Sequence, residues 1–340
     1  MKKLSVVFFA ITLLMCLSIH ALADGDVYVT FSGNCNVRDI PSLDGEVIGS
    51  ASPRSKLSYA MDFLFDDRGV AWYAVYLDDE IGWVSSKYAS VKGLYYALDK
   101  ETPLAFDLDG DGVDEQIRPD GDNGMTIETE AGYDPVSFPC YDPKWVWFVD
   151  IDENGVVEIL VSSDEASDDY YTECLHYAGG RLDKVPFSVN EWGGDGALGL
   201  ARRIDSGVLT LYGIHETVGT YESYRDFKLV EGDHFEPANK GIYTFKYHKP
   251  EREIFDQLGV TVLVEIPFEG ISGTRDGSLA PDDLIILTGT DCNSRLWFKA
   301  RDGRCGIIAL SMSPDKWGDM VLSIGERPIN EALSGIFCAG

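Results

Sequence analysis

Two acidic stretches of the sequence repeat the same spacing of oxygen-bearing side chains. They read DLDGDGVDE at residues 107–115 and DIDENGVVE at residues 150–158, 43 residues further on. Carboxylate or amide oxygens stand at positions 1, 3, 5 and 9 and glycine at position 6: Asp107, Asp109, Asp111, Gly112 and Glu115, then Asp150, Asp152, Asn154, Gly155 and Glu158. Carboxylates crowded in this way repel one another unless a cation lies between them.

This spacing predicts calcium sites. Calcium takes about six to eight oxygen ligands at about 2.3 to 2.6 Å. Alternate positions of a tight loop direct their side chains to one side, and the glycine lets the backbone turn so that the carbonyl of position 7, Val113 or Val156, joins them. The alternative is a pair of plain hairpin turns with a solvated acidic surface. Two copies in register favour calcium in at least one loop.

The residues around the two loops are not those of an EF-hand. Position 12 is Arg118 or Val161 where an EF-hand has glutamate, and the flanks TPLAF, WVWFV and EILVS are typical of strands. The pattern instead resembles the FG-GAP or VCBS repeat, in which such a loop joins two strands of a β-sheet unit. A third copy, degenerate at most, is expected near residue 193 in NEWGGDGALGL. Three units are too few for a closed propeller, so an open sheet or sandwich is expected over residues 93–249.

Strands must position these loops, because strand patterns dominate the whole chain. Short alternating runs rich in Val, Tyr, Trp, Phe and Ile are broken by Asp-Gly, Gly-Gly and Pro-Ser turns, and long amphipathic helical patterns are absent. Segments such as VWFVDID, GVLTLYGI and DLIILTG are too short and too rich in β-branched or aromatic residues for ordinary helices. The sequence therefore predicts an all-β fold.

The segment 24–92 carries a recognisable pattern. It resembles the bacterial SH3 (SH3b) domain through Asn36, Val37, Arg38, Pro41, Ser42, Val47, Ile48, Gly49, Trp72, Tyr73, Gly82, Trp83 and Val84. The resemblance implies a small SH3-like barrel that recognises peptidoglycan peptides or other extracellular ligands. Tyr73, Tyr76 and Tyr88 are the candidate ligand-binding residues, and packing in the barrel core is the alternative role for them. For Trp72 and Trp83 the core is the favoured position.

The segment 250–340 repeats part of this pattern. GSLAPDDLIIL from Gly277 aligns with GSASPRSKLSY from Gly49, and WFKARDGRCGII from Trp297 aligns with WYAVYLDDEIGWV from Trp72. This similarity predicts a second, diverged SH3-like barrel at the C-terminus. Ile307 replaces the second tryptophan, which makes inherited ligand binding less secure, and chance similarity between two hairpins is the alternative.

The N-terminus and the charge indicate an exported acidic protein. Residues 1–23 are typical of a signal peptide, with Lys2 and Lys3, an apolar run and Ala21-Leu22-Ala23 before Asp24; an uncleaved membrane anchor is the weaker alternative. Cleavage removes two lysines and no acid, so the formal charge changes from −29 to −31. Phosphate backbones and anionic membrane surfaces repel such a chain, so nucleic acid is not an expected partner. Divalent cations are the expected counter-charge. No other segment of the sequence is expected to span a membrane.

Cysteine usage leaves several possibilities open. Seven cysteines less Cys16 of the signal peptide leave six, an even number compatible with disulfides in an exported protein. A hairpin turning at Asp302-Gly303 would place Cys305 opposite Ala300 and far from Cys292, which disfavours that one pairing. The other connectivities stay open.

No signature of catalysis is present in the sequence. There is no Gly-x-Ser-x-Gly elbow, phosphate-binding glycine loop or zinc-protease helix, and acidic pairs are expected by chance among 57 acidic residues. The expected function is therefore non-catalytic: a secreted or cell-wall-associated protein that binds peptidoglycan or a cell-surface protein or peptide, with structural calcium. The alternative is a calcium-ordered adhesion or protein-interaction module, and a hydrolase with an unrecognised site is less favoured.

Overall fold

The computed structural model describes most of the chain after the expected signal peptide. The described residues are 27–77, 80–96, 103–121, 123–164, 170–189, 195–215, 218–247, 251–314 and 320–336, and the signal peptide at 1–23 lies outside them. Strands make up most of the elements, and the sheets are antiparallel. The all-β prediction is confirmed.

A seven-stranded antiparallel sheet, the N-terminal sheet, contains the first strands. They are β1 (Tyr28–Phe31), β2 (Cys35–Arg38), β3 (Val47–Ala51), β4 (Lys56–Phe65), β5 (Ala71–Leu77), β6 (Glu80–Ser85) and β7 (Ala89–Lys92). Their spatial order is β3-β2-β6-β5-β4-β1-β7, so the described strands do not close into a barrel. The register shifts between Tyr59 and Phe63 of β4, where Met61 has a φ of 48°, and an irregularity of this kind bends a strand.

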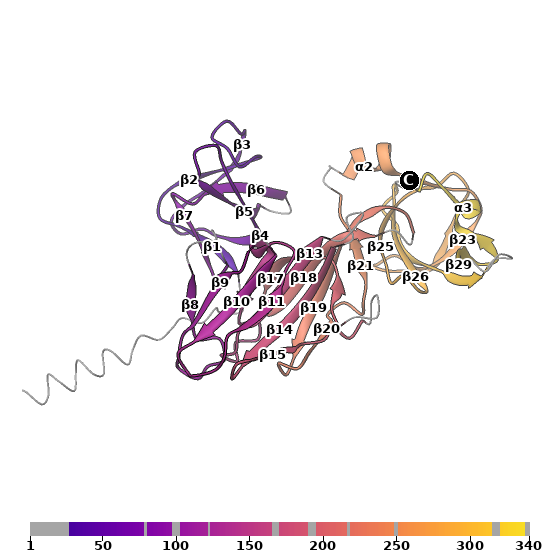
Figure 1. The fold of residues 1–340 in the computed structure, drawn as a ribbon. Helices are drawn as coiled ribbons and strands as arrows, with labels where there is room; N and C mark the ends of the chain where they lie inside the picture. Colours follow the sequence, from indigo (N-terminus) through magenta and orange to yellow (C-terminus); the bar gives the residue numbers. More distant parts are fainter. Residues whose placement is uncertain are drawn as a thin grey trace, which may run out of the picture.

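Three four-stranded antiparallel meanders follow, and Figure 1 shows their strands side by side. The first meander is β8 (Leu104–Phe106), β9 (Glu115–Pro119), β10 (Gly124–Thr129) and β11 (Val136–Pro139). The second is β12 (Val146–Val149), β13 (Glu158–Asp164), β14 (Tyr170–Ala178) and β15 (Arg181–Lys184), preceded by the 3-10 helix η1 (Pro143–Trp145). The third is β17 (Leu200–Asp205), β18 (Val208–His215), β19 (Tyr221–Val230) and β20 (His234–Pro237), and β16 (Ala197–Leu198) pairs with β14.

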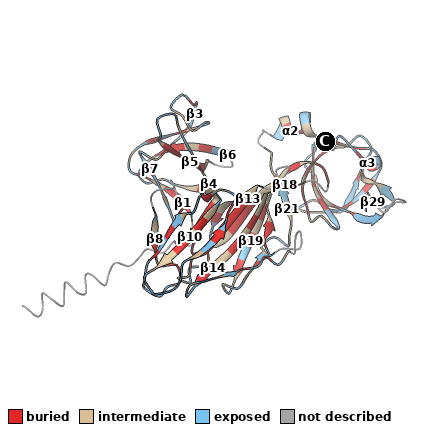
Figure 2. Cartoon of the chain, viewed as in Figure 1, coloured by how far each residue is buried: buried red, intermediate tan, exposed pale blue. Residues whose placement is uncertain are grey.

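Two hydrophobic cores hold the meanders together. One lies between the first and second meanders and includes Phe106, Ile117 and Phe148. The other joins the second and third meanders to the N-terminal sheet and includes Trp147 and Phe227. Figure 2 shows the buried residues concentrated along these strands. Alternate residues of β19 are buried, as the period of two in a strand with one buried face requires.

The third meander continues into the C-terminal sheet through β21 (Tyr243–Phe245), which pairs with both β19 and β25. The remaining elements are α2 (Glu251–Leu258), β22 (Val260–Val262), β23 (Ile266–Gly270), β24 (Gly277–Leu279), β25 (Leu284–Thr290), β26 (Arg295–Ala300), β27 (Cys305–Ala309), β28 (Ser311–Pro314), β29 (Met320–Ile324), β30 (Arg327–Pro328), α3 (Ile329–Ala332) and β31 (Leu333–Ser334). The expected domain boundary falls at residues 248–250, outside the described residues, while hydrogen bonding continues from β19 to β25. The described C-terminal strands do not close into a barrel either.

Two further sequence predictions can be compared with the structure. Cys305 pairs with Lys299 rather than with Ala300, because the amide of Ala300 donates to the carbonyl of Arg304 and the turn between them is longer than expected. The described cysteines, Cys35, Cys140, Cys174, Cys292 and Cys305, are free thiols. Among the described residues, no helix combines the length and apolar composition needed to cross a bilayer.

Candidate metal centres and an aromatic cleft

The two acidic loops connect equivalent strands of neighbouring meanders and lie next to each other. The first joins β8 to β9 and the second joins β12 to β13. The amide of Val157 donates to the carbonyl of Leu108 at 3.0 Å. A β-carbon on Gly110 would come within 3.3 Å of the carbonyl oxygen of Gly155, so only glycine fits easily at this close approach.

Each loop brings three carboxylates together. One oxygen each from Asp107, Asp109 and Glu115 lies within 4.8 Å of the other two, and the same holds for Asp150, Asp152 and Glu158. These six are among the ten residues predicted from the sequence as calcium ligands.

The other four nominated residues lie at positions 5 and 7 of the loops. Asp111 is not in the first carboxylate group, and its side chain accepts the amide of Val113 at 2.8 Å. Asn154 accepts the amide of Val156 in the same way at 2.7 Å. In each loop, the side chain at position 5 therefore holds the backbone amide of position 7 in place.

The backbone conformation of the two loops is also repeated. The carboxylate at position 1, Asp107 or Asp150, accepts the amide of the glycine at position 6 at 2.9 Å in both loops. That glycine has a φ of 88° in both, a left-handed value that side chains disfavour. The glutamate at position 9 accepts the amide of position 2, at 2.8 Å for Glu115 and 2.6 Å for Glu158. The repeat in the sequence is therefore a repeat in three dimensions.

Burial makes these carboxylates costly to ionise without a counter-charge. Glu115, Asp150 and Glu158 are 1%, 2% and 0% exposed. Burial raises the pKa of each of the three side chains above its ordinary value. In addition, Oδ1 of Asp152 is buried with no hydrogen-bond partner. A buried anionic oxygen without a donor fits a site built for a cation.

Position 3 of each loop contacts the next meander. Oδ2 of Asp109 accepts the amide of Gly179, in the turn between β14 and β15, at 3.0 Å. Oδ2 of Asp152 lies close to Gly232, in the turn between β19 and β20, where an added β-carbon would be 3.7 Å away. Ordering either loop therefore also fixes the turn of the neighbouring meander.

The glutamates at position 9 have different neighbours on the adjacent strand. Glu115 is in register with Thr129, and Glu158 is in register with His176, whose Nε2 lies 2.9 Å from Oε1 of Glu158. The hydrogen bond from His176 opposes the effect of burial on the pKa of Glu158. Sequence reasoning missed this role of His176, because the strand register that creates it cannot be read from residue spacing.

The equivalent connection in the third meander is a tight turn. β17 passes to β18 through Ser206 and Gly207, and a β-carbon on Gly207 would lie 3.4 Å from the carbonyl oxygen of Ile151. The degenerate third copy expected near residue 193 falls partly on residues 190–194, outside the described residues. Its Asp195 and Gly196 precede β16 and do not connect the first two strands of the third meander.

Replacing Glu153 with glycine is expected to stabilise the second loop. Glu153 is exposed and has a φ of 60°, while the first loop has Gly110 at the same position with a φ of 76°. Because a side chain in the left-handed region costs about 1 to 2 kcal/mol and glycine adds about 0.5 to 1 kcal/mol of chain entropy, the free energy of unfolding should rise by up to about 1 kcal/mol. Urea denaturation measures this, with Gly110→Glu as the reciprocal variant that should destabilise. A loss of stability in Glu153→Gly would contradict the strain argument.

The three candidate tyrosines do not share one groove. Tyr73 is 8% exposed and packs edge-on against Tyr59, so it lies in the core. Tyr88 is 51% exposed and lies between β6 and β7. Tyr76 lines a cleft of about 280 Å³ between the N-terminal sheet and the third meander, whose walls are Asp62, Ala74, Tyr76, Ile81, Trp83, Arg202, Tyr212, Glu222 and Tyr224.

The cleft combines aromatic faces with charges of both signs. Arg202 forms an ion pair with Asp62 at 3.2 Å, and its guanidinium lies 5.8 Å from the ring centre of Tyr212. The rings of Tyr212 and Tyr224 are 5.4 Å apart. Trp83 is only half-buried and lines the cleft, although the sequence favoured a core position for it. Strand alternation could have marked Tyr212 and Tyr224 as facing away from the core, but not their distance from Trp83.

One histidine and one cysteine also lie together. Sγ of Cys292 is 3.8 Å from Nδ1 and 3.9 Å from Nε2 of His215. Burial and the nearby charge of Arg225 lower the pKa of His215 to about 4. A sulfur equally distant from both ring nitrogens is poorly placed for an in-plane hydrogen bond, and an imidazole with this pKa is a weak base at neutral pH.

The fold and these sites define an all-β protein in which stacked antiparallel meanders carry paired acidic loops. No family model, curated protein or solved structure matches the chain.

Proposed function

We propose that both acidic loops bind calcium as a structural ion. In each loop the ligands would be the side chains at positions 1, 3, 5 and 9 and the carbonyl of position 7. The support is the repeated carboxylate group, its burial and the unpartnered oxygen of Asp152. Hard oxygen ligands suit calcium, and water would complete a shell of about six to eight oxygens. Extracellular calcium modules typically have a Kd of about 10⁻⁴ to 10⁻³ M.

We further propose that the protein is secreted or cell-wall-associated and binds peptidoglycan peptides. The observation that carries this proposal is the aromatic cleft beside Tyr76 and Trp83, on the unit that resembles an SH3b domain. Aromatic faces bury the apolar parts of a ligand, and the nearby Arg202 and Glu222 fit the carboxylates and amines of a short peptide. A peptide contact of this kind also avoids the repulsion between an acidic protein and an anionic wall polymer.

A binding role fits the chemistry of the described residues better than hydrolysis does. A cysteine nucleophile needs a base placed and tuned to remove its proton. His215 and Cys292 lack both the alignment and the basicity for that step.

An adhesion or protein-interaction module is the second candidate. It is favoured by the packing of the N-terminal sheet on the meanders, because Tyr212 and Tyr224 of the third meander cover part of the groove beside Trp83. A cleft narrowed in this way suits one extended segment of a partner protein.

Co-sedimentation of residues 24–340 with purified peptidoglycan tests the proposed function. The protein should pellet with the wall in calcium and less in EDTA, since the third meander, which forms one wall of the cleft, also packs on the second loop. Trp83→Ala should weaken binding about 30-fold or more if the tryptophan is an anchor worth about 2 kcal/mol. Tyr88→Ala changes an exposed tyrosine in the connection between β6 and β7, outside the lining; it is the matched control and should bind normally. Protein that stays in the supernatant in both buffers would reject wall binding and favour the adhesion module.

A further inference from the structure

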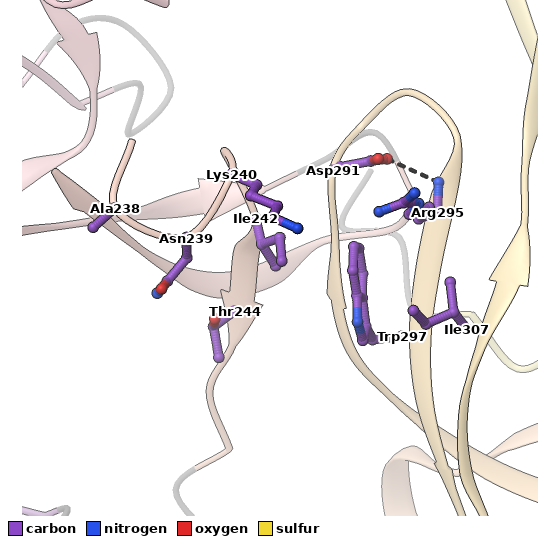
Figure 3. A pocket seen from close by; sticks show the side chains of 9 residues that line it. All are labelled: Ala238, Asn239, Lys240, Ile242, Thr244, Asp291, Arg295, Trp297 and Ile307. Atoms are coloured by element: carbon purple, nitrogen blue, oxygen red, sulfur yellow. Dashed lines mark hydrogen bonds between the residues drawn. The ribbon is translucent and has the colours of Figure 1, made fainter. Parts of the chain in front are cut away.

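A second cavity lies between the segment that connects β20 to β21, with β21 itself, and strands β26 and β27 of the C-terminal sheet. Its volume is about 460 Å³, and its lining is Ala238, Asn239, Lys240, Ile242, Thr244, Asp291, Arg295, Trp297 and Ile307. Figure 3 shows Lys240 and Ile242 on one side and Arg295 and Trp297 on the other. The two walls come from segments about 50 residues apart in the sequence.

The junction of β21 and β25 fixes the two walls. Thr244 of β21 is in register with Gly289 of β25, and Gly289 is in register with Trp297 of β26. A β-carbon on Gly289 would lie 2.6 Å from the carbonyl oxygen of Tyr243, a distance that a side chain cannot adopt. The glycine therefore permits the strand pairing that places β21 beside the tryptophan.

The lining of the cavity carries two basic side chains and one acidic one, within a strongly acidic protein. Lys240 and Arg295 are exposed, and neither forms an ion pair with another described residue. The carboxylate of Asp291 accepts the amides of Asn293, Ser294 and Arg295 at 2.8 to 3.0 Å, and it forms no ion pair with either of the two described basic side chains. Two cations that pair with no described residue are available to an anion.

The lining also includes apolar side chains of two paired strands. Trp297 is half-buried and lies directly opposite Ile307 on the paired strand. Asn239 and Thr244 also line the cavity; Nδ2 of Asn239 donates to Oδ2 of Asp226 at 2.9 Å, which leaves its Oδ1 as an acceptor, and Thr244 adds a hydroxyl group. A flat apolar surface with a few convergent polar groups is typical of a small-molecule site.

We propose that this cavity binds a carboxylated sugar, such as a uronic acid unit of an extracellular polysaccharide. Arg295 and Lys240 bind the carboxylate, and the ring of Trp297 packs against the apolar face of the pyranose. Asn239 and Thr244 hydrogen-bond the hydroxyl groups. The site is separate from the cleft beside Trp83, so it does not depend on peptidoglycan recognition.

Ligand-observed NMR with a matched pair of sugars tests the proposal. Methyl glucuronide and methyl glucoside differ only in the carboxylate, and each is titrated into the calcium-loaded chain 24–340. The glucuronide should bind about tenfold or more tightly, since a charge-assisted hydrogen bond is worth that factor or more. The difference should shrink at high salt, because exposed charges are screened. Equal binding of the two sugars, or no binding of either, would overturn the proposal.

Two variants locate the binding in this cavity. Arg295→Gln should remove most of the preference for the glucuronide, and Trp297→Ala should weaken both sugars. Lys228→Gln removes one exposed charge from β19 outside the lining and should change neither affinity. Circular dichroism melting confirms that each variant is folded. Unchanged preference in a folded Arg295→Gln protein would rule out the assigned role of this arginine.

Discussion

Calcium is expected to raise the melting temperature of the metal-free protein by about 6 to 12 °C. At ten times its Kd, an ion contributes about 1.4 kcal/mol per site through binding only the folded chain, so two sites contribute about 3 kcal/mol. For a cooperative unit of about 150 to 250 residues, each kcal/mol shifts the melting temperature by about 2 to 4 °C. Thermal melting followed by circular dichroism, with stepwise addition of calcium to dialysed protein, measures the shift.

Two variants of the second loop distinguish the loss of a calcium ligand from the loss of a negative charge. Glu158→Gln removes a buried carboxylate of the metal group and should abolish about half of the calcium-induced shift. Glu153→Gln removes the same charge from an exposed position of the same loop and should leave the shift intact. A melting temperature that does not respond to calcium in the unmodified protein would reject both metal sites.

The calcium effect should depend on pH in a defined direction. Burial raises the pKa of Glu115, Asp150 and Glu158 in the metal-free fold, so the folded state binds protons more tightly than the unfolded chain does. For these groups, stability of the metal-free protein therefore rises as the pH falls toward the unfolded pKa values of about 4. Protons also compete with calcium. The difference in melting temperature with and without calcium should thus be largest at neutral pH and should disappear in acid.

Replacing Trp147 with alanine is expected to lower the free energy of unfolding by about 3 to 5 kcal/mol. Trp147 is 1% exposed on β12, in the core that joins the second meander to the N-terminal sheet. Its ring centre lies 6.3 Å from that of Tyr59 and 5.3 Å from that of Tyr96, so truncation leaves a cavity beside these two aromatic residues. Urea denaturation measures the loss. Limited proteolysis should show the N-terminal sheet becoming susceptible first.

A neighbouring tryptophan provides the control for that prediction. Trp145 is half-buried, and its ring stacks on that of Tyr141 with centres 5.2 Å apart. Trp145→Ala should cost about 1 kcal/mol, the worth of a partly exposed aromatic pair. Equal losses for the two variants would mean that Trp147 does not anchor the joint core.

The candidate metal loops could be predicted from the sequence because the residues that would bind an ion lie within nine consecutive positions. The spacing of side chains in a nine-residue loop determines which oxygens can point toward a common centre. The glycine at position 6 indicates that the backbone turns sharply there. The sequence predicted Asp107, Asp109 and Glu115 as ligands, and one carboxylate oxygen of each lies within 4.8 Å of the other two in the structure. The partnership of Glu158 with His176 was not accessible, since it depends on which residues of β13 and β14 are opposite each other.

Local residue patterns were enough to predict the strand-rich chain, the repeated loops and the all-β class, because each follows from alternation or spacing within one short segment. The stacking of the sheets places Trp83 in one cleft with Tyr212 and Tyr224, and Lys240 in one cavity with Trp297. These shared linings join residues about 60 to 140 positions apart. These arrangements depend on how the sheets stack on one another and share hydrophobic cores. Packing between residues so far apart in the sequence produces no periodic pattern from which it could be predicted.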